Sequence, residues 1–363
     1  MTVELLEGSE ALAKAMVSAG CRFFAGYPMT PFTEVLEGMA KYLPDVGGDC
    51  VNAESELEAV GMAWGAAAAG ARTATGSVGQ GLSLMQESIA ELCFARVPIV
   101  ILNMARGQGD YYQATRGGGH GDYRTIVLAP ADLAEGVQLI QRAFHLADLY
   151  RNPVMFVGDY YLAHVIEAVE TGPVDFGPLP PRDWALDGSS SGTGKAKIIS
   201  QIHPTKRDAE RFIEYGAYLE TSGAKIAAIT DTLEPMFESR YCEDADYVVT
   251  AYGTPARIIR YVVDQLRAEG VKVGYFRPIT LWPFPEKAIV EATRSARAIG
   301  VYELNAGQMI DDVRLSVRDK PIEATGGISF DSSGFGIAPE LTPAKVMGRI
   351  REAMARLEEG VAA

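Results

Sequence analysis

The sequence predicts an α/β protein whose strands form parallel sheets. From residue 9 to about 165, segments with helical periodicity alternate with short apolar segments, and a second, shorter series begins near residue 246. Several of the short segments are almost continuously apolar, for example IVILNMAR at 99–106. Strands that are apolar toward both sides are typical of a parallel sheet covered by helices on both faces.

The first series begins with the helix SEALAKAMVSAG, 9–20, which ends at a glycine, and continues with the strand CRFFAGYP, 21–28, which ends in a turn. The next segment, 31–44, is amphipathic and predicts a helix. The elements expected after it are a strand end and a small-residue helix at 49–72, a strand, turn and helix at 73–98, a strand at 99–106, and a strand, helix and strand at 124–164.

Residues from about 171 to 206 interrupt the alternation with a segment rich in Pro, Gly and Ser, which predicts a linker or an extended arm. The second series is expected to contain helices at 205–223, 255–270, 286–296 and 342–360, strands at 246–254, 271–285 and 297–304, and a rigid apolar corner in RPITLWPFP. We therefore divide the chain into a first domain (1–170), a linker arm with a helix (171–245) and a smaller domain (246–363).

The composition excludes several classes of function. The chain has 363 residues, 48% of them hydrophobic, and a net charge of −14, so it lacks the basic surface that binds nucleic acid or an anionic membrane. No segment has the apolar length of a membrane span, and the N-terminus lacks the pattern of a signal peptide. The four cysteines are far apart and form no CxxC pair, so we expect a cytoplasmic protein that binds no metal by itself.

GYPMTPFTEV, 26–35, connects a strand to a helix at the edge where ligands bind in open α/β sheets. Pro28 and Pro31 each fix φ near −65° and remove a backbone donor, so the short loop between them is stiff and orients Thr30. Alternatively, Pro31 simply occupies the first position of a helix, where proline is well tolerated.

AESELEAVGMAWGAAAAGA predicts a helix with an unusual number of small residues, which allow another backbone or a ligand to approach closely. Glu54, Glu56 and Glu58 lie at its start. Carboxylates in the first turn favour the helix dipole, which is a sufficient structural explanation for all three. A carboxylate there can also face a heterocyclic cofactor.

Three further segments contain candidate site residues. GSVGQGLSLMQE places Gly79 and Gln80 between a strand and a helix, but it matches neither the dinucleotide fingerprint nor the P-loop. Arg106 ends an apolar strand, where it can bind a substrate carboxylate or close the strand at the surface. His120, in the glycine-rich ATRGGGHGDYR, is a candidate general base, or a structural hydrogen-bonding group at a subunit interface.

Taken together, several segments resemble the α-type subunit of the 2-oxoacid:ferredoxin oxidoreductases, and most closely the branched-chain (2-oxoisovalerate) and 2-oxoglutarate types. The segments are GYPMTP, AESELEAVGMAWGAAAAGAR, LSLMQESIAE, ATRGGGHGDYR, YRNPVMFVGD, RPITLWPFP and YELNAGQM. The resemblance implies a thiamine-diphosphate-binding, pyrimidine-type parallel-sheet domain followed by a smaller transketolase C-terminal-like α/β domain. It also implies oxidative decarboxylation of a 2-oxo acid to acyl-CoA and CO2, with electrons passed to ferredoxin.

The resemblance assigns roles to the candidate residues. Glu56 matches the glutamate that binds the aminopyrimidine of the cofactor, Thr30 the threonine beside the reacting carbonyl, and Arg106 the arginine that binds the substrate carboxylate. The other positions that the resemblance assigns to cofactor binding are Pro28, Gly79 and Gln80. The stiff loop around Thr30 would then hold a hydroxyl over the reacting centre.

The resemblance also implies partners. The chain lacks the GDG motif for diphosphate and Mg2+, and it lacks cysteine clusters. The implied partners are therefore a β subunit that shares the thiamine diphosphate and holds the diphosphate and Mg2+ site, together with a γ subunit and a ferredoxin-like δ subunit. The [4Fe-4S] clusters are expected on these partner chains, with CoA as co-substrate and ferredoxin as electron acceptor. We expect a hetero-oligomer with a dimeric core, in which this chain alone is inactive.

The sequence departs from the family pattern at two places. Met29 replaces a common isoleucine, which we expect to be harmless, and the loop after Arg106 is shorter than usual, which predicts room for a bulkier or aromatic 2-oxo acid. The alternative functions are half of a non-oxidative thiamine enzyme (decarboxylase or transketolase type) and a scaffolding subunit. Branched-chain, aromatic, 2-oxoglutarate and pyruvate substrates are all compatible with the sequence.

Overall fold

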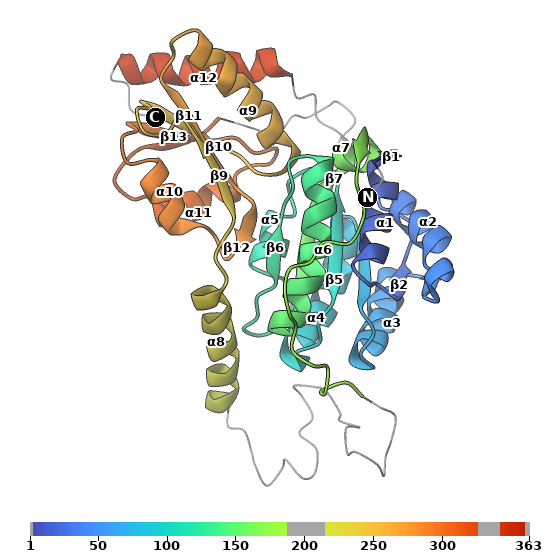
Figure 1. Cartoon of the computed structure of the whole chain (residues 1–363). Helices are drawn as coiled ribbons and strands as arrows, with labels where there is room; N and C mark the ends of the chain where they lie inside the picture. The colour runs from blue at the N-terminus through green and yellow to red at the C-terminus, as the bar shows by residue number, and fades with distance from the viewer. Residues whose placement is uncertain (1–2, 187–214, 326–341, 360–363) are drawn as a thin grey trace.

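The structure, a computed structural model, describes residues 3–186, 215–325 and 342–359. Its largest element is a seven-stranded sheet in the order β12-β6-β7-β5-β4-β2-β3, which is parallel except for β12 (Figure 1). The strands are β2 (Phe23–Gly26), β3 (Asp49–Asn52), β4 (Thr73–Ser77), β5 (Val100–Ala105), β6 (Ile126–Leu128), β7 (Val154–Asp159) and β12 (Thr280–Trp282). The predicted parallel α/β fold is confirmed for this part of the chain.

Helices cover both faces of this sheet, as the continuous apolar strands predict. On one face α1 packs against α2 and α6, and on the other α3 packs against α4. These helices are α1 (Gly8–Ser18), α2 (Thr33–Tyr42), α3 (Glu56–Ala68), α4 (Gly79–Ala95) and α6 (Leu133–Tyr150), with the short helices α5 (Tyr111–Thr115) and α7 (Tyr160–His164). Every residue of β4 and β5 is buried, which explains why their sequences show no alternation.

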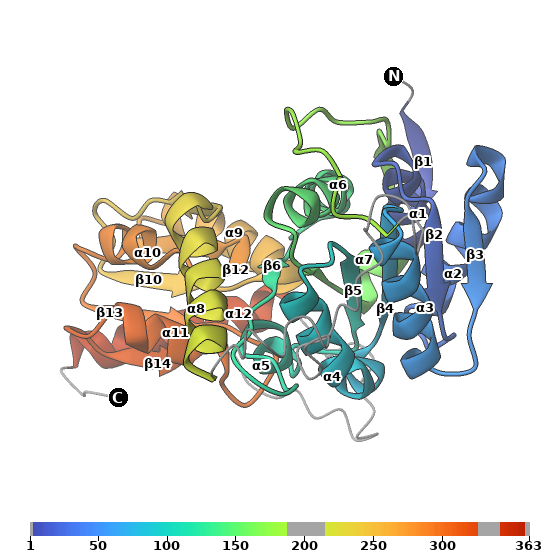
Figure 2. The same cartoon turned by 90° about the horizontal axis from the view of Figure 1, so that it is seen from below.

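A second sheet of five strands, in the order β14-β13-β10-β11-β9, lies beside the first (Figure 2). It contains β9 (Phe237–Arg240), β10 (Tyr247–Thr250), β11 (Val273–Pro278), β13 (Ala298–Val301) and β14 (Ile322–Ala324). The helices of this part are α8 (Tyr215–Thr232), α9 (Gly253–Ala268), α10 (Glu286–Ala292), α11 (Met309–Ser316) and α12 (Pro343–Glu358). The α9 helix packs on β11 and on α12.

Among the contacts that join the two sheets are those of β12 and of Arg277. Strand β12 leaves the second series and pairs antiparallel with β6, so Trp282 lies opposite Val127 at the edge of the first sheet. Arg277 of β11 forms a bidentate ion pair with Glu135 at the start of α6, at 2.6 and 2.8 Å, and a further bond to Glu238 at 3.2 Å. The apolar corner predicted around Trp282 is therefore a packing element between the sheets.

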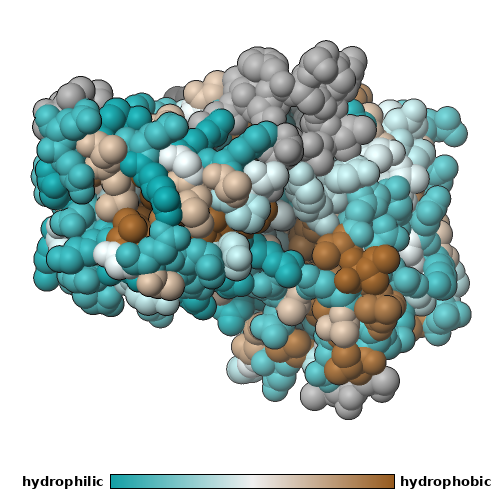
Figure 3. Space-filling view, turned by 90° about the horizontal axis from the view of Figure 1, so that it is seen from above, coloured by the Kyte–Doolittle hydropathy of each residue, from teal (hydrophilic) through white to brown (hydrophobic). Residues whose placement is uncertain are grey.

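A separate two-stranded sheet pairs β1 (Glu4–Glu7) with β8 (Ile166–Val169). Apolar side chains gather on the face of the molecule shown in Figure 3. Val3, Leu5 and Ile166, on and beside these two strands, are 62–73% exposed.

Within the described ranges no helix is long and apolar enough to cross a membrane.

The expected elements differ from the structure at a few positions. The helix expected at 205–223 is observed as α8, Tyr215–Thr232, and it continues nine residues further than expected, while residues 205–214 lie outside the described part. The sequence did not predict β1, β8, β9, β14, α5, α7 or α11. Glu303, near the end of the predicted strand at 297–304, and Asn305, directly after it, follow β13 in a loop.

Candidate functional site

The predicted site residues follow four neighbouring strands at their carboxyl ends. Thr30 comes after β2, Glu56 after β3, Gly79 after β4 and Arg106 after β5, and these strands are adjacent in the order β5-β4-β2-β3. Because the carboxyl ends of parallel strands meet at one edge of a sheet, the fold brings all four positions to the edge where α/β proteins bind ligands.

Glu56 is the buried member of the three glutamates at the start of α3. Its exposure is 2%, whereas Glu54 and Glu58 are exposed. The Ser77 hydroxyl at the end of β4 donates a hydrogen bond to Glu56 Oε1 at 2.9 Å. The second carboxylate oxygen of Glu56 accepts no hydrogen bond from any described residue. A buried carboxylate with a free acceptor is suited to bind a donor group of a ligand.

The first turn of α4 presses against this carboxylate. A Cβ atom on Gly81 would overlap with Ser77 Oγ and Glu56 Oε1 and would lie 2.6 Å from Glu56 Cγ. A Cβ atom on Gly79 would overlap in the same way with the carboxylate of Asp110. The glycines between β4 and α4 therefore allow close packing around two carboxylates, as expected from their position in a strand-to-helix turn.

Asp110 lies beside Gly79 at this edge, although the sequence did not predict it there. Its carboxylate accepts a hydrogen bond from Asn103 Nδ2 at 3.2 Å, and burial raises the pKa of Asp110. The sequence carries only a weak sign of this position, because an aspartate directly before a helix such as YYQAT is a typical N-cap. In the structure the Asp110 side chain does not cap that helix. Its contact with Gly79 arises only when the chain folds, so no local sequence pattern predicts it.

Thr30 and Arg106 are in direct contact. Arg106 Nε donates a hydrogen bond to the backbone carbonyl of Thr30 at 2.9 Å. Among the described residues, no hydrogen bond or ion pair uses the remaining guanidinium nitrogens of Arg106, and Thr30 is exposed. The arrangement places an unpaired guanidinium beside an accessible hydroxyl, which suits a small anionic substrate. Pro28 and Gln80 are exposed at the same edge.

The short loop after Arg106 connects the two sheets. Gln108 is 6% exposed, and its amide donates to the carbonyl of Tyr252 at 2.9 Å and accepts from the backbone N–H of Leu304 at 2.8 Å. Asn305 Nδ2 donates to the Gln108 carbonyl at 2.8 Å. The Asn305 amide therefore binds within the chain. The same holds for Glu303, whose carboxylate caps the first N–H groups of α11.

His120 lies apart from these residues. It is exposed, and its backbone N–H donates to Glu87 Oε2 at 3.2 Å, near the middle of α4. Its neighbours Gly118 and Gly119 donate to Gln86 and Tyr123, which hold the glycine-rich segment against α4. The observed contacts connect His120 to α4 and do not bring it to Glu56 or Arg106.

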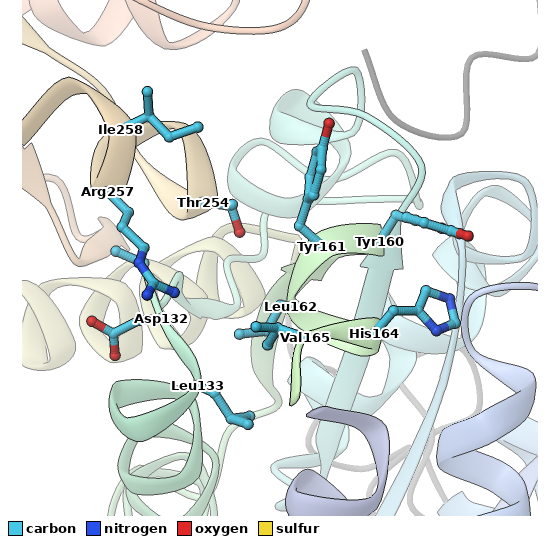
Figure 4. A pocket seen from close by; sticks show the side chains of 11 residues that line it. Asp132, Leu133, Tyr160, Tyr161, Leu162, His164, Val165, Thr254, Arg257 and Ile258 are labelled. Carbon is cyan, nitrogen blue, oxygen red and sulfur yellow. The ribbon is translucent and has the colours of Figure 1, made fainter. Parts of the chain in front are cut away.

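A cavity of about 400 Å3 lies between α7 and the start of α9 (Figure 4). Apolar side chains such as Leu162, Val165 and Ile258 line it, together with Tyr160 and His164. None of the predicted site residues is among its lining residues, so this cavity is separate from the candidate site at β2–β5.

Two family models match the chain, and together with the fold and the edge site they define a thiamine-diphosphate-binding protein. Residues 14–182 match the model described as "Pyruvate flavodoxin/ferredoxin oxidoreductase, thiamine diP-bdg". Residues 245–331 match the model described as "Pyruvate:ferredoxin oxidoreductase core domain II".

Curated relatives extend the match over most of the chain. Ketoisovalerate oxidoreductase subunit VorB of Methanothermobacter marburgensis is 38% identical, covering 89% of this chain and 92% of the relative. 2-Oxoglutarate synthase subunit KorA of the same organism is 35% identical, covering 86% and 91%. The chain belongs to the 2-oxoacid:ferredoxin oxidoreductase family, which confirms the resemblance seen in the sequence.

Solved structures agree with this assignment. The 2-oxoglutarate:ferredoxin oxidoreductase from Magnetococcus marinus, with 2-oxoglutarate, coenzyme A and succinyl-CoA bound, superimposes with a TM-score of 0.79 at 26% identity. The match covers 96% of this chain and 65% of that longer chain. A split-gene transketolase, an inactive β4 tetramer, matches with a TM-score of 0.58 at 15% identity over 96% of this chain and 98% of that one, which shows the shared fold.

Proposed function

We propose that this chain is the α subunit of a thiamine-diphosphate-dependent 2-oxoacid:ferredoxin oxidoreductase and that it holds the aminopyrimidine end of the cofactor. The observation that carries the proposal is the buried Glu56 carboxylate at the ligand-binding edge, with one oxygen bonded to Ser77 and the other free of described donors. The complex converts a 2-oxo acid and CoA to acyl-CoA and CO2 and passes two electrons to ferredoxin.

The residues present fit thiamine diphosphate. A protonated ring nitrogen of the aminopyrimidine would supply the hydrogen-bond donor that the free oxygen of Glu56 lacks. The glycines at the start of α4 let this helix pack closely on the same carboxylate and hold it in place. When bound, thiamine diphosphate supplies the carbon nucleophile and the electron sink that decarboxylation requires. Glu56 holds a proton on the pyrimidine nitrogen and keeps the ring in one orientation.

Arg106 and Thr30 act on the substrate in this proposal. The free guanidinium nitrogens of Arg106 bind the carboxylate of the 2-oxo acid, and the Thr30 hydroxyl donates to the carbonyl oxygen beside it. The bond between Arg106 Nε and the Thr30 carbonyl keeps the two groups at a constant separation. Such fixed positioning contributes to the rate because small displacements of a reacting group are costly.

The remaining groups of the reaction belong to partner subunits. We assign the diphosphate and Mg2+ site to a β subunit, and the [4Fe-4S] clusters to this subunit and to a ferredoxin-like δ subunit, with a γ subunit completing the assembly. The support for a multi-subunit enzyme is that the curated relatives carry subunit names. Pro28, Gly79 and Gln80 line the cofactor on this side of the junction.

The test compares two glutamates of the same helical turn in the co-purified complex. Glu56→Gln removes the buried carboxylate, whereas Glu58→Gln alters an exposed residue of the same turn. We expect Glu56→Gln to lower kcat by about 100-fold or more with artificial acceptors, and to weaken thiamine diphosphate binding measured by calorimetry. Glu58→Gln should leave both unchanged. Full turnover in Glu56→Gln would overturn the proposal.

The same preparation identifies the substrate. A panel of branched-chain, aromatic and dicarboxylic 2-oxo acids and pyruvate, each assayed with CoA, ranks them by kcat/KM. The short loop between Arg106 and Asp110 predicts that bulky side chains are accepted. A strict preference for pyruvate would contradict that expectation while leaving the proposed reaction intact.

A further inference from the structure

A basic pocket lies at the opposite edge of the first sheet from Glu56 and Arg106. Arg96 directly follows α4 before β5, and Arg151 directly follows α6 before β7. Because β5 and β7 are neighbours, these two residues meet at the amino ends of the strands. Lys225 on α8 completes the cluster around a cavity of about 570 Å3, which is lined by Arg96, Leu149, Tyr150, Arg151, Ala224, Lys225 and Ala228.

The local backbone fixes the positions of both arginines. Arg96 and Arg151 are helix C-caps in the left-handed conformation, with φ of 55° and 48°. Arg151 Nε donates to the Arg96 carbonyl at 3.2 Å, and its guanidinium lies 4.8 Å from the centre of the Trp184 ring. Arg151 is therefore held on both sides, and its other guanidinium nitrogens make no hydrogen bond to a described residue.

The three cations have no carboxylate partner in the part of the chain that the structure describes. Arg96 is exposed, and its guanidinium makes no hydrogen bond to any described residue. Lys225 Nζ donates to a neutral acceptor, the Cys93 carbonyl, at 2.6 Å. The negative charge of Asp183 acts on Arg151 without forming an ion pair. The pocket is thus positively charged in a chain of net charge −14, where acidic residues are abundant.

The cluster is unfavourable without an anion. Burial, together with the smaller effects of the positive charges of Arg96 and Arg151, lowers the pKa of Lys225 to about 8. The segment 187–214, which leads into α8, contains five basic and four acidic residues, so its composition offers no excess of negative charge. Three like charges that converge on one cavity indicate a ligand that neutralises them.

We propose that this pocket binds a phosphate-bearing small molecule at a site distinct from the candidate active site. Two guanidinium groups and an ammonium group are the donors that proteins use for phosphate oxygens. The cavity is larger than one phosphate group, and Leu149 and Tyr150 provide an apolar wall for an attached organic group. Because it lies at the amino ends of the strands, its ligand does not react at the edge that carries Glu56.

Calorimetric titration of the purified complex tests the proposal with pyrophosphate and ADP as probes and adenosine as the uncharged control. We expect one additional binding event per chain for the phosphate probes and none for adenosine. Arg96→Gln and Lys225→Gln should each weaken this event at least about tenfold. Arg22→Gln, which alters an exposed arginine before β2, should not change it.

The affinity should also depend on pH. The groups facing Lys225 are Arg96 and the Cys93 thiol from the end of α4, and Arg151 with Tyr150 from the end of α6. Because Lys225 is protonated below its folded pKa, binding should weaken as the pH rises through about 8, and Lys225→Gln should abolish this dependence.

Three results would overturn the proposal. They are the absence of any phosphate-probe binding beyond the active site, binding that Arg96→Gln and Lys225→Gln both leave unchanged, and binding of polyglutamate but not of the phosphate probes. The last result would assign the pocket to an acidic protein segment. Circular dichroism of each variant confirms that the fold is intact, and Arg96→Gln removes no internal hydrogen bond of the described residues.

Discussion

Gly81→Ala is the substitution that most directly challenges the packing around Glu56. A methyl group at this position would overlap with Ser77 Oγ and Glu56 Oε1 and crowd Glu56 Cγ at 2.6 Å. Glu56 is 2% exposed and Ser77 is fully buried, so neither side chain can move into solvent without breaking their mutual hydrogen bond. We expect destabilisation by about 1–3 kcal/mol from overpacking, although alanine otherwise favours a helix over glycine by about 1 kcal/mol.

The assay combines thermal unfolding with thiamine diphosphate titration of the complex. Gly348→Ala in α12 is the matched control, because it is a glycine inside a helix and its added Cβ meets nothing within 4 Å. Gly348→Ala should raise the stability by up to about 1 kcal/mol and leave cofactor binding unchanged. Gly81→Ala should lower both. If Gly81→Ala behaves like the control in both measurements, the close packing of α4 on Glu56 is wrong.

The remaining predictions concern other parts of the chain. Arg277→Met leaves the partly buried Glu135 carboxylate without its ion-pair partner, so the free energy of unfolding should fall by about 3–5 kcal/mol, whereas Arg294→Met, at an exposed pair, should change it by less than about 1 kcal/mol. If denaturant unfolding showed the same loss of unfolding free energy for Arg277→Met and Arg294→Met, the claim that the buried ion pair stabilises the fold more than the exposed one would be wrong. Burial raises the pKa of Cys21 and Cys93 to about 12, so both thiols should resist alkylation at pH 8 in the folded chain and react after unfolding. Alkylation of the native thiols at the rate of a free cysteine would refute this. Arg106→Gln should raise the KM for the 2-oxo acid about tenfold or more, because a charge-assisted bond to its carboxylate is lost, and an unchanged KM would remove this role.

The sequence predicted much of the fold because the physical signals were local. Continuous apolar strands between amphipathic helices indicate a parallel sheet, and the order of these elements places Thr30, Glu56 and Arg106 after neighbouring strands. Once the strand order is known, the edge site follows. The local pattern could not distinguish Glu56 from Glu54 and Glu58, because burial of one carboxylate depends on how α4 packs against α3, and only the family resemblance selected Glu56.

The features that were missed depend on contacts between distant parts of the chain. Strand β12 pairs with β6, about 150 residues earlier, and no local pattern reveals such a pairing. The contact of Asp110 with Gly79, and the bonds of Gln108 to the second sheet, likewise join separate segments. The helix α11 has no recognisable start signal in the sequence, because its N-cap residue, Gln308, does not cap it with its side chain. The carboxylate of Glu303, five residues earlier, instead accepts a hydrogen bond from the backbone N–H of Gln308.

The most direct measurement is an experimental structure of the assembled complex with thiamine diphosphate bound. The account predicts that the free carboxylate oxygen of Glu56 accepts a hydrogen bond from the aminopyrimidine ring, with the diphosphate end of the cofactor on another subunit. A cofactor whose pyrimidine lies away from this carboxylate, with Glu56 still bonded only to Ser77, would contradict the account.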